Sequence, residues 1–229
     1  MTPAPPEGLL LLDKPAGVTS HDCVDAVRRA YGERSVGHLG TLDPFATGLL
    51  VVLVGRATRL ANFMDAEPKT YAATIEFGSE TDTDDVTGTV TRTAEAPDQE
   101  VVRRAIEELT GEIEQVPPDY SAKQVGGRRA YAAARTGEPL VLDPVRVTVH
   151  AWRITSFEGE RLEATIVCGG GTYVRALARD LGRAAGSAAH LAALRRTGVG
   201  DFDVSDATTL EELRAAPPPL RRLRVIADG

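Results

Sequence analysis

Residues 37–50 constrain the fold of this chain more than any other stretch. They combine three glycines, a proline, His38 and a single carboxylate, Asp43, and they run directly into the apolar residues 49–54. Glycine adopts backbone conformations that other residues avoid, and a proline pushes the residue before it out of the helical region. We therefore expect a turn-rich loop that holds Asp43 in an extended conformation at the mouth of a rigid strand. Such loops often carry chemistry, although an Asp-Pro pair taken alone is more often a simple turn.

The composition is that of a globular protein that does not span a membrane. The chain has 229 residues, of which 42% are hydrophobic and 26% are charged, which is enough for the core of one large domain. No apolar run reaches the length of a membrane span, and the first residues lack a signal-peptide pattern. The two cysteines, Cys23 and Cys168, have no cysteine near them in the sequence, so we expect reduced, buried thiols in a cytoplasmic protein.

The net charge of −7 argues against a nucleic-acid partner, but the charges are unevenly distributed. Residues 67–119 contain fourteen acids and four bases. The negative charge of this segment therefore exceeds the net negative charge of the whole chain. Two other groups are basic: Lys123, Arg128, Arg129 and Arg135, and later Arg175, Arg179, Arg183, Arg195 and Arg196. Since a polyanion responds to charges within about 10 Å at moderate salt, an acidic chain with basic patches can bind RNA on one face.

The pattern of elements predicts an α+β protein with a mixed sheet, because strands and helices alternate without a regular βαβ order. Thr19 or Ser20 is expected to cap the first helix, and Thr208 with Glu211 to form a capping box for the last one. The predicted strands cover residues 8–12, 49–54, 70–77, 89–93, 145–157, 161–168 and 199–204. The predicted helices cover residues 57–64, 98–109, 128–135, 173–184 and 187–194, besides the first and last.

No common cofactor or metal motif occurs. The four histidines share no ligand spacing, and there is no Walker loop, paired-cysteine site or Ser-His-Asp elbow. The acidic turn at residues 82–88 is similar to a calcium loop, but its glycine is one place late and Thr93 stands where a glutamate is needed. Residues 169–172 could hold a phosphate, although a tight strand-to-helix turn is the commoner meaning of this pattern. We therefore expect neither a metal nor a cofactor.

Several local patterns occur together and in a fixed order. They are Leu12-Asp13-Lys14-Pro15-Ala16-Gly17, Gly37-His38-Leu39-Gly40-Thr41-Leu42-Asp43-Pro44, Lys69-Thr70-Tyr71, Tyr120-Ser121-Ala122, Gly170-Gly171-Thr172-Tyr173-Val174-Arg175 and Leu194-Arg195-Arg196-Thr197. From about residue 8 to about residue 213, this set resembles the TruB family of bacterial tRNA pseudouridine(55) synthases.

The resemblance implies a pseudouridine synthase fold, in which a mixed, mainly antiparallel β-sheet is surrounded by helices and carries a central RNA-binding cleft. The chain would then consist of a disordered tail (1–7), a catalytic domain (8–216) and a C-terminal tail (217–229) without a complete PUA-type RNA-binding domain. The implied partner is the T arm of tRNA, with no membrane and no cofactor. A monomer is the default expectation.

The resemblance also implies a reaction and three catalytic residues. A uridine in the T loop is flipped out, its bond from C1′ to N1 is cut, and the uracil is rejoined through C5. Asp43 corresponds to the nucleophile, Tyr71 to the tyrosine that stacks on the flipped base, and Arg175 to the arginine that pairs with the aspartate. These roles are physically sound, because a guanidinium lowers a carboxyl pKa by roughly 1–3 units and stacking on a ring restores about 1–3 kcal/mol per base.

The remaining expected site residues bind RNA. His38 corresponds to a histidine that enters the RNA stack beside the extruded base, and Leu194 to an apolar wall of the base pocket. Arg59 stands where the family often has a lysine that contacts RNA. Lys123, Arg128 and Arg129 are expected to bind phosphates, although Lys123 lies one position before the family's usual lysine.

Two other functions stay open from the sequence. A tRNA-binding or tRNA-folding module would use the basic patches without catalysis. A metal-free hydrolase would use Asp43 and release uracil, which an isomerase does not. The sequence leaves open which atom Asp43 attacks.

Overall fold

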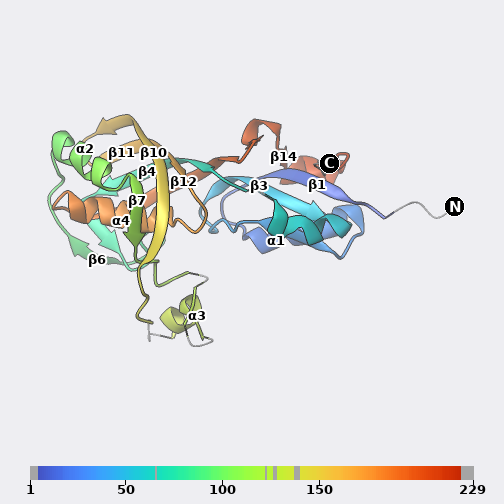
Figure 1. Ribbon diagram of the computed structural model, residues 1–229, viewed down its shortest axis with the longest axis horizontal. Coiled ribbons are helices and arrows are strands. Elements are labelled where there is room, and N and C mark those ends of the chain that lie inside the picture. Colours follow the sequence, from blue (N-terminus) through green and yellow to red (C-terminus); the bar gives the residue numbers. More distant parts are fainter. Residues whose placement is uncertain (1–4, 65, 122, 126–127, 137–139, 223–229) are drawn as a thin grey trace, which may run out of the picture. The chain divides into compact units, whose positions relative to one another are not determined.

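The computed structural model describes residues 5–64, 66–121, 123–125, 128–136 and 140–222 (Figure 1). Within this chain, residues 1–69 and 195–229 form one compact unit, and residues 70–194 form another. Most of the expected N-terminal tail (1–4) and the end of the expected C-terminal tail (223–229) lie outside the described residues. The described part of that second tail packs on the first unit, since Leu9 and Arg221 exchange two backbone hydrogen bonds.

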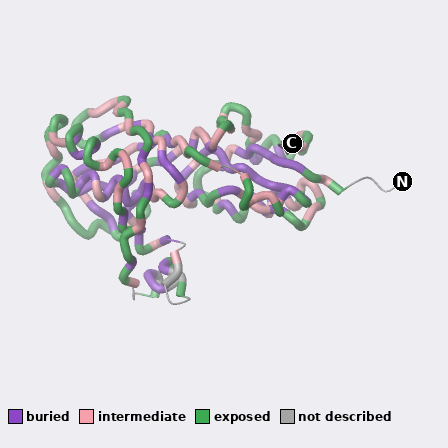
Figure 2. Tube along the Cα trace, viewed as in Figure 1, coloured by how far each residue is buried: buried purple, intermediate pink, exposed green. Residues whose placement is uncertain are grey.

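The sheet of the first unit is built around two apolar strands. β1 (Gly8–Lys14) pairs antiparallel with β3 (Thr47–Val54), from Gly8 opposite Val54 to Lys14 opposite Gly48. On the other side of β3, the end of β12 (Ala189–Val199) pairs parallel with its start, and β2 (Val36–Leu39) pairs antiparallel with its end. β1 and β3 are buried along most of their length (Figure 2), which explains why both are continuous apolar runs.

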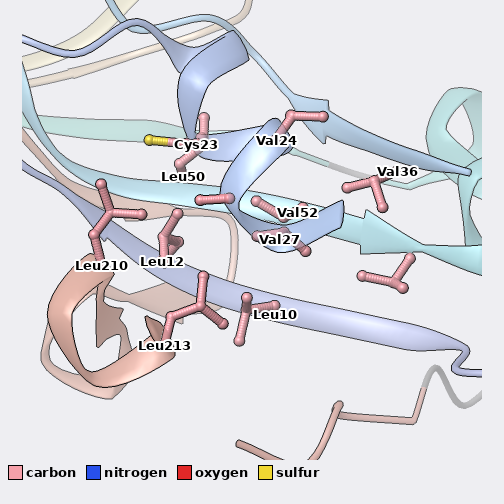
Figure 3. Packing of buried hydrophobic residues seen from close by; sticks show 12 residues of the cluster. Leu10, Leu12, Cys23, Val24, Val27, Val36, Leu50, Val52, Leu210 and Leu213 are labelled. Atoms are coloured by element: carbon pink, nitrogen blue, oxygen red, sulfur yellow. The ribbon is translucent and has the colours of Figure 1, made fainter. Parts of the chain in front are cut away.

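Helix α1 (Ser20–Tyr31) covers one face of this sheet. Thr19 caps it, as expected, in a capping box with Asp22, and Gly32 ends it in the left-handed conformation. Helix α5 (Leu210–Ala215) packs beside α1 on the same cluster (Figure 3). The labelled side chains of this core are Leu10, Leu12, Cys23, Val24, Val27, Val36, Leu50, Val52, Leu210 and Leu213.

The other face of the sheet has its own cluster, built on the alternate side chains of β1 and β3. The 3₁₀ helices η1 (Gly55–Phe63) and η2 (Val204–Asp206) contribute to it, and β14 (Thr208–Thr209) and β13 (Phe202–Asp203) complete the strands of this unit. The buried members are Leu9, Leu11, Leu39, Leu49, Val51, Leu53, Ala57 and Val199.

The sheet of the second unit contains a group of antiparallel strands around β10. β10 (Val145–Glu158) pairs with β11 (Arg161–Cys168) and with β7 (Gly111–Gln115), and the strand order continues from β11 through β4 (Lys69–Phe77) to β12. Helix α2 (Gln99–Glu108) packs beside α4 (Val174–Ala184), as Figure 1 shows. The short elements are β5 (Ser79–Thr81), β6 (Val90–Thr93), β8 (Gln124–Val125), β9 (Arg128–Arg129) and α3 (Ala130–Arg135).

One predicted helix is wrong, and another begins two residues later than predicted. Residues 187–194 were predicted to be helical, but Ala189–Val199 form strand β12 with largely alternating burial. Strand pairing on this stretch outweighs the high helix propensity of its alanines. In the predicted helix 128–135, Arg128 and Arg129 instead form strand β9, which pairs with β8, and α3 begins at Ala130.

Three boundaries also differ from the prediction. The predicted strand 199–204 is a reversal, in which β12 ends at Val199 and β13 pairs back along it. The last capping box is formed by Thr209 and Glu212, one residue later than expected. His38, expected in a loop, lies on strand β2.

Candidate functional site

Asp43 lies in the connection between β2 and β3, on a turn that is braced on both sides. Before it, the buried Ser20 hydroxyl accepts a hydrogen bond from the Leu42 N–H (2.9 Å) and donates one to the Leu42 carbonyl (3.0 Å). After it, the Pro44 carbonyl accepts a hydrogen bond from the Gly17 N–H (2.8 Å). The Ala46 N–H closes the turn on the Asp43 carbonyl (3.1 Å). The expected turn before the strand is confirmed, and its backbone is tied to the start of α1.

Lys14 supports this turn from within the core. Its side chain is fully buried, and its ammonium donates to the carbonyls of Val18 (2.8 Å), Pro15 (3.1 Å) and Pro44 (3.3 Å). These three bonds use all three donors of an ammonium group. Burial lowers the pKa of Lys14, while the charges of Cys23 and Asp43 oppose that shift. Lys14 therefore fixes the backbone beside Asp43 and also contributes positive charge near its carboxylate.

Replacing Lys14 by methionine should destabilise the protein and lower its activity. The change keeps the length of the side chain but leaves three carbonyls without their donor, at a cost of about 3 kcal/mol in the free energy of unfolding. Urea unfolding at pH 7 measures this cost, and Arg29→Met, on the exposed side of α1, is the matched control. An unfolding free energy equal to that of the control would show that the three carbonyls do not depend on Lys14.

Arg196 joins the residues on either side of the Asp43 loop. It is 1% exposed, and it donates from Nε to the Leu49 carbonyl (2.7 Å) and from Nη2 to the Gly40 carbonyl (3.1 Å). Gly48 has a φ of 102°, and a Cβ there would lie 2.2 Å from the Arg196 carbonyl oxygen, so only glycine fits. The preceding Arg195 forms a two-bond ion pair with Asp13 (2.7 and 3.0 Å).

His38 lies on β2, and the Nδ1 atom of its ring is buried. Its Nδ1 has no hydrogen-bond partner among the described residues. Burial lowers the pKa of His38, and the positive charge of Arg196 lowers it further. The imidazole is therefore neutral at pH 7, which suits a ring that packs against a base better than it suits a cationic phosphate contact.

Among the candidate residues of the second unit, Arg175 is held by two backbone carbonyls and a carboxylate. It is the second residue of helix α4, is 4% exposed, and donates to the carbonyls of Thr83 and Tyr120 (both 2.9 Å). Its Nη1 also lies 3.6 Å from Oδ2 of Asp85. Oδ1 of Asp85 accepts from the Thr83 hydroxyl and from the backbone and hydroxyl of Thr87, which leaves Oδ2 facing the guanidinium. Arg175 is thus a buried, oriented cation rather than a solvated charge.

Arg179 repeats this arrangement one helical turn later. It donates to Asp84 (2.8 Å), to Asp180 (2.9 Å) and to the Val116 carbonyl (2.8 Å). The two arginines therefore hold the same two segments, residues 83–85 and 116–120, against α4. Burial raises the pKa of Asp84 to about 6, while the charges of Arg179 and Arg175 oppose the shift.

This raised pKa predicts a pH-dependent stability. Between pH 4 and 6 the folded protein keeps a proton on Asp84 that the unfolded chain releases, so the free energy of unfolding falls as pH rises through this window. Relative to Asp84→Asn, the wild-type protein should lose about 2–3 kcal/mol between pH 4 and pH 7. Urea unfolding of both proteins across this range tests the prediction, and parallel curves would contradict it.

The other predicted residues are placed as follows. Tyr71 on β4 and Leu194 on β12 are buried, at 7% and 8% exposure, whereas Arg59 on η1 and Arg128 on β9 are exposed. Lys123 is half-buried, and the side chain of Arg129 lies outside what the structure describes. The Tyr120 and Tyr131 rings meet edge to face at 6.0 Å, which connects α3 to the loop that Arg175 holds.

The structure therefore gathers two sets of residues. In the first unit, the Asp43 loop lies with Lys14, Ser20 and Arg196, and His38 is on the neighbouring strand. In the second unit, Arg175 lies with Asp85 and the Tyr120 carbonyl. Asp43 and Arg175 belong to different units, and their pairing stays a prediction. The sequence did not predict that Lys14, Ser20 and Arg196 support the Asp43 loop or that Asp85 faces Arg175. Only for Lys14 did the sequence offer a signal, since this lysine follows an apolar run and directly precedes a Pro-Ala-Gly turn.

Two further properties bear on the function. Within the described residues, no three His, Cys, Asp or Glu side chains gather as a metal site requires. In the same part of the chain, no helix combines the length and hydropathy that crossing a bilayer takes.

Comparison with known proteins identifies the family. The model described as "TruB family pseudouridylate synthase (N terminal domain)" matches residues 28–174, and "tRNA pseudouridylate synthase B C-terminal domain" matches residues 175–223. The chain belongs to the TruB family. The predicted family is thereby confirmed, as are the α+β pseudouridine synthase fold and an isomerase activity.

Relatives in this family are similar over most of their length. The chain is 48% identical over 214 residues to tRNA pseudouridine synthase B of Arthrobacter sp. (strain FB24), covering 90% of this chain and 70% of the relative. It is 46% identical over 217 residues to the Bordetella pertussis protein of the same name, covering 92% of this chain and 88% of that one.

Solved structures show the same fold. One is the crystal structure of a Cbf5-Nop10-Gar1 complex, with a TM-score of 0.70 and 27% identity over 91% of this chain. Another is an H/ACA RNP bound to a substrate RNA that contains 2′-deoxyuridine, with a TM-score of 0.67 and 26% identity. The TruB-family chain spans about half of each of these, 54% and 52%.

Proposed function

We propose that this TruB-family protein isomerises uridine 55 in the T loop of tRNA to pseudouridine, with Asp43 as the nucleophile. The observation that carries the proposal is a carboxylate on a turn whose backbone is fixed on both sides by buried donors. A nucleophile must be held at a set angle to the bond it attacks, and a braced turn provides this better than a free loop.

The reaction is balanced without any other reactant. The bond between ribose C1′ and uracil N1 breaks, the uracil turns, and a bond from C1′ to C5 forms while C5 loses its proton and N1 gains one. Nothing is released, so the step is an isomerisation. The alternatives for Asp43 are attack on C1′, which gives a ribosyl ester, or attack on C6 of the uracil.

Positive charge around the site would keep Asp43 ionised. Lys14 supplies such charge within the first unit, and Arg175, the counterpart of the family's arginine, is proposed to supply more. Arg175 suits this role because its guanidinium is already dehydrated and oriented by two carbonyls and by Asp85. An oriented guanidinium stabilises a carboxylate at little further cost in side-chain entropy.

The other residues would bind the flipped nucleotide and its neighbours. Extruding a base costs a few kcal/mol of stacking, and Tyr71 is proposed to restore part of this by stacking on the uracil, with Leu194 as an apolar wall. His38, which is neutral, is proposed to fill the space that the base leaves in the RNA stack. Arg59, Lys123, Arg128 and Arg129 are proposed to bind phosphates.

The proposed substrate is the T arm, and the proposed working form is a cytoplasmic monomer. Bases in an unpaired loop are accessible to a protein, whereas those in an A-form duplex are not. An acidic protein with local basic patches would be attracted to such a loop by those patches rather than by its net charge.

One incubation tests this function. The protein is mixed with an unmodified T-arm stem-loop, pseudouridine is mapped at each loop uridine, and free uracil is measured in the same reaction. Conversion at uridine 55 alone, without uracil, is the expected result, and a stem-loop with cytidine at that position is the control. Released uracil would indicate a hydrolase, and tight binding without conversion would indicate a non-catalytic tRNA-binding module.

A further inference from the structure

The apolar face of η1 loses its cover at the last turn of the helix. A 3₁₀ helix has three residues per turn, so Ala57, Leu60 and Phe63 lie on one face. Ala57 is 2% exposed and Leu60 is half-buried, but Phe63 is 85% exposed. An exposed phenylalanine taken alone is unremarkable on a protein surface. Here Phe63 follows a buried and a half-buried residue on the same face of η1. The residues near it on the helix indicate what it could bind.

An exposed cation, Arg59, stands four residues before this ring on η1. The next face of η1 carries Arg56, Arg59 and Asn62, all exposed. Arg56 is paired with Glu7 (2.8 Å), whereas Arg59 has no hydrogen bond or ion pair with any described residue. Residues 55–64 contain no acid. An exposed aromatic ring and an exposed guanidinium on one short helix are groups that single-stranded nucleic acid binds, the ring by stacking on a base and the cation by a phosphate.

The position of η1 within the first unit connects it to the Asp43 loop. Thr58 on η1 bonds the Ser35 hydroxyl (3.0 Å), just before strand β2 and His38. From Phe63 the chain reaches Lys69 in six residues, and the Lys69 side chain lies 3.5 Å from where a Cβ on Gly40 would be. Six residues span at most about 20 Å. Phe63 therefore lies within about 20 Å of Lys69, whose side chain reaches this loop.

We propose that Phe63 and Arg59 form a second contact with the RNA substrate, in which an unpaired nucleotide outside the catalytic position stacks on the Phe63 ring. Arg59 holds a phosphate next to that nucleotide. This inference rests on the proposed function, because it takes tRNA as the bound molecule. It assigns a role to Phe63 that no catalytic step requires.

Binding of a full-length unmodified tRNA transcript tests the proposal. All variants carry Asp43→Asn as well, so that the dissociation constant is measured without turnover. Phe63→Ala should raise the dissociation constant about 5- to 100-fold, Phe63→Leu should do nearly the same, and Phe63→Trp should bind as tightly as the parent. Val90→Ala, which removes a 54% exposed apolar side chain in the second unit, is the matched control and should change nothing.

The salt dependence separates the two side chains. Arg59→Ala should lower the slope of log K against log salt by about 0.7, whereas Phe63→Ala should leave the slope unchanged, because stacking releases no counterion. The thermal midpoint of Phe63→Ala should equal that of the parent, since the ring is exposed. An unchanged affinity of Phe63→Ala, tight binding by Phe63→Leu, or a lowered thermal midpoint would each overturn the proposal.

The outcome also distinguishes this proposal from the function on which it rests. If the wild-type protein forms pseudouridine in the transcript but Phe63→Ala binds normally, the second contact fails and the function stands. If the wild-type protein forms no pseudouridine in tRNA, the proposed function fails, and weakened binding by Phe63→Ala would then mark η1 as an RNA contact of a non-catalytic protein.

Discussion

Replacing Asp43 by asparagine should lower the rate of pseudouridine formation by at least about ten-thousand-fold, because an amide cannot act as the nucleophile. The dissociation constant for the T-arm stem-loop should change by no more than a few-fold. The turn itself should persist, since Ser20, Lys14 and the Gly17 N–H bind the backbone of Leu42 and Pro44, which the substitution leaves in place. Single-turnover mapping of pseudouridine at saturating protein separates the loss of rate from any loss of binding.

Asp201→Asn is the control for this experiment, since it removes an exposed carboxylate from the same unit. It should retain the wild-type rate. Turnover by Asp43→Asn within a hundred-fold of the wild-type protein would remove Asp43 from the role of nucleophile. A large loss of RNA affinity would instead make it a binding residue.

Replacing Arg175 by alanine should both destabilise the protein and abolish conversion. Arg175 and Asp85 are each 5% exposed at the side chain, so removing the cation leaves a buried carboxylate without its counter-ion and two carbonyls without donors. The loss of one partner of a buried pair costs about 3–5 kcal/mol in the free energy of unfolding. Urea unfolding measures this cost, and the rate is measured on the fraction that remains folded.

Arg175→Lys separates charge from geometry. A lysine keeps the charge but lacks the planar fork that reaches the Thr83 and Tyr120 carbonyls together, so the rate should fall more than the stability does. Arg183→Ala is the control on the same helix, because its side chain is 57% exposed and Glu80 keeps its ion pair with Arg92. The control should lose less than about 1 kcal/mol. Full activity of Arg175→Lys would mean that charge alone is needed.

The sequence predicted those elements whose cause is local. The α1 helix follows from Thr19, Asp22 and Gly32, which act within one turn of its ends. Strand β3 and the hairpin of β10 and β11 follow from runs of apolar and β-branched residues, which favour strands without any tertiary contact. The family and its fold were also predicted, because ordered motifs specify them without any knowledge of packing.

The predictions that failed are those in which strand pairing decides the local structure. Residues 189–199 form a strand because they lie next to β3 and β4 in the strand order, although their alanines favour a helix. His38 lies on a strand because β2 pairs with the end of β3. For residues 189–199 the partners β3 and β4 are far away in the sequence and leave no local signal. For His38 the partner is the next strand, and the turn-rich composition of residues 37–48 concealed the pairing.

For the Asp43 loop, the sequence by itself determined that residues 37–50 turn sharply, carry one carboxylate and enter a buried strand. Glycine and proline restrict the backbone wherever they occur, and this needs no tertiary contact. Only the tertiary structure decided what fixes the turn: the Ser20 hydroxyl, the Lys14 ammonium and the Arg196 guanidinium, which bind carbonyls of the loop and its flanks from 22, 30 and about 150 positions away in the sequence. A buried carbonyl must find a donor, and which donor it finds depends on the folding of the whole unit.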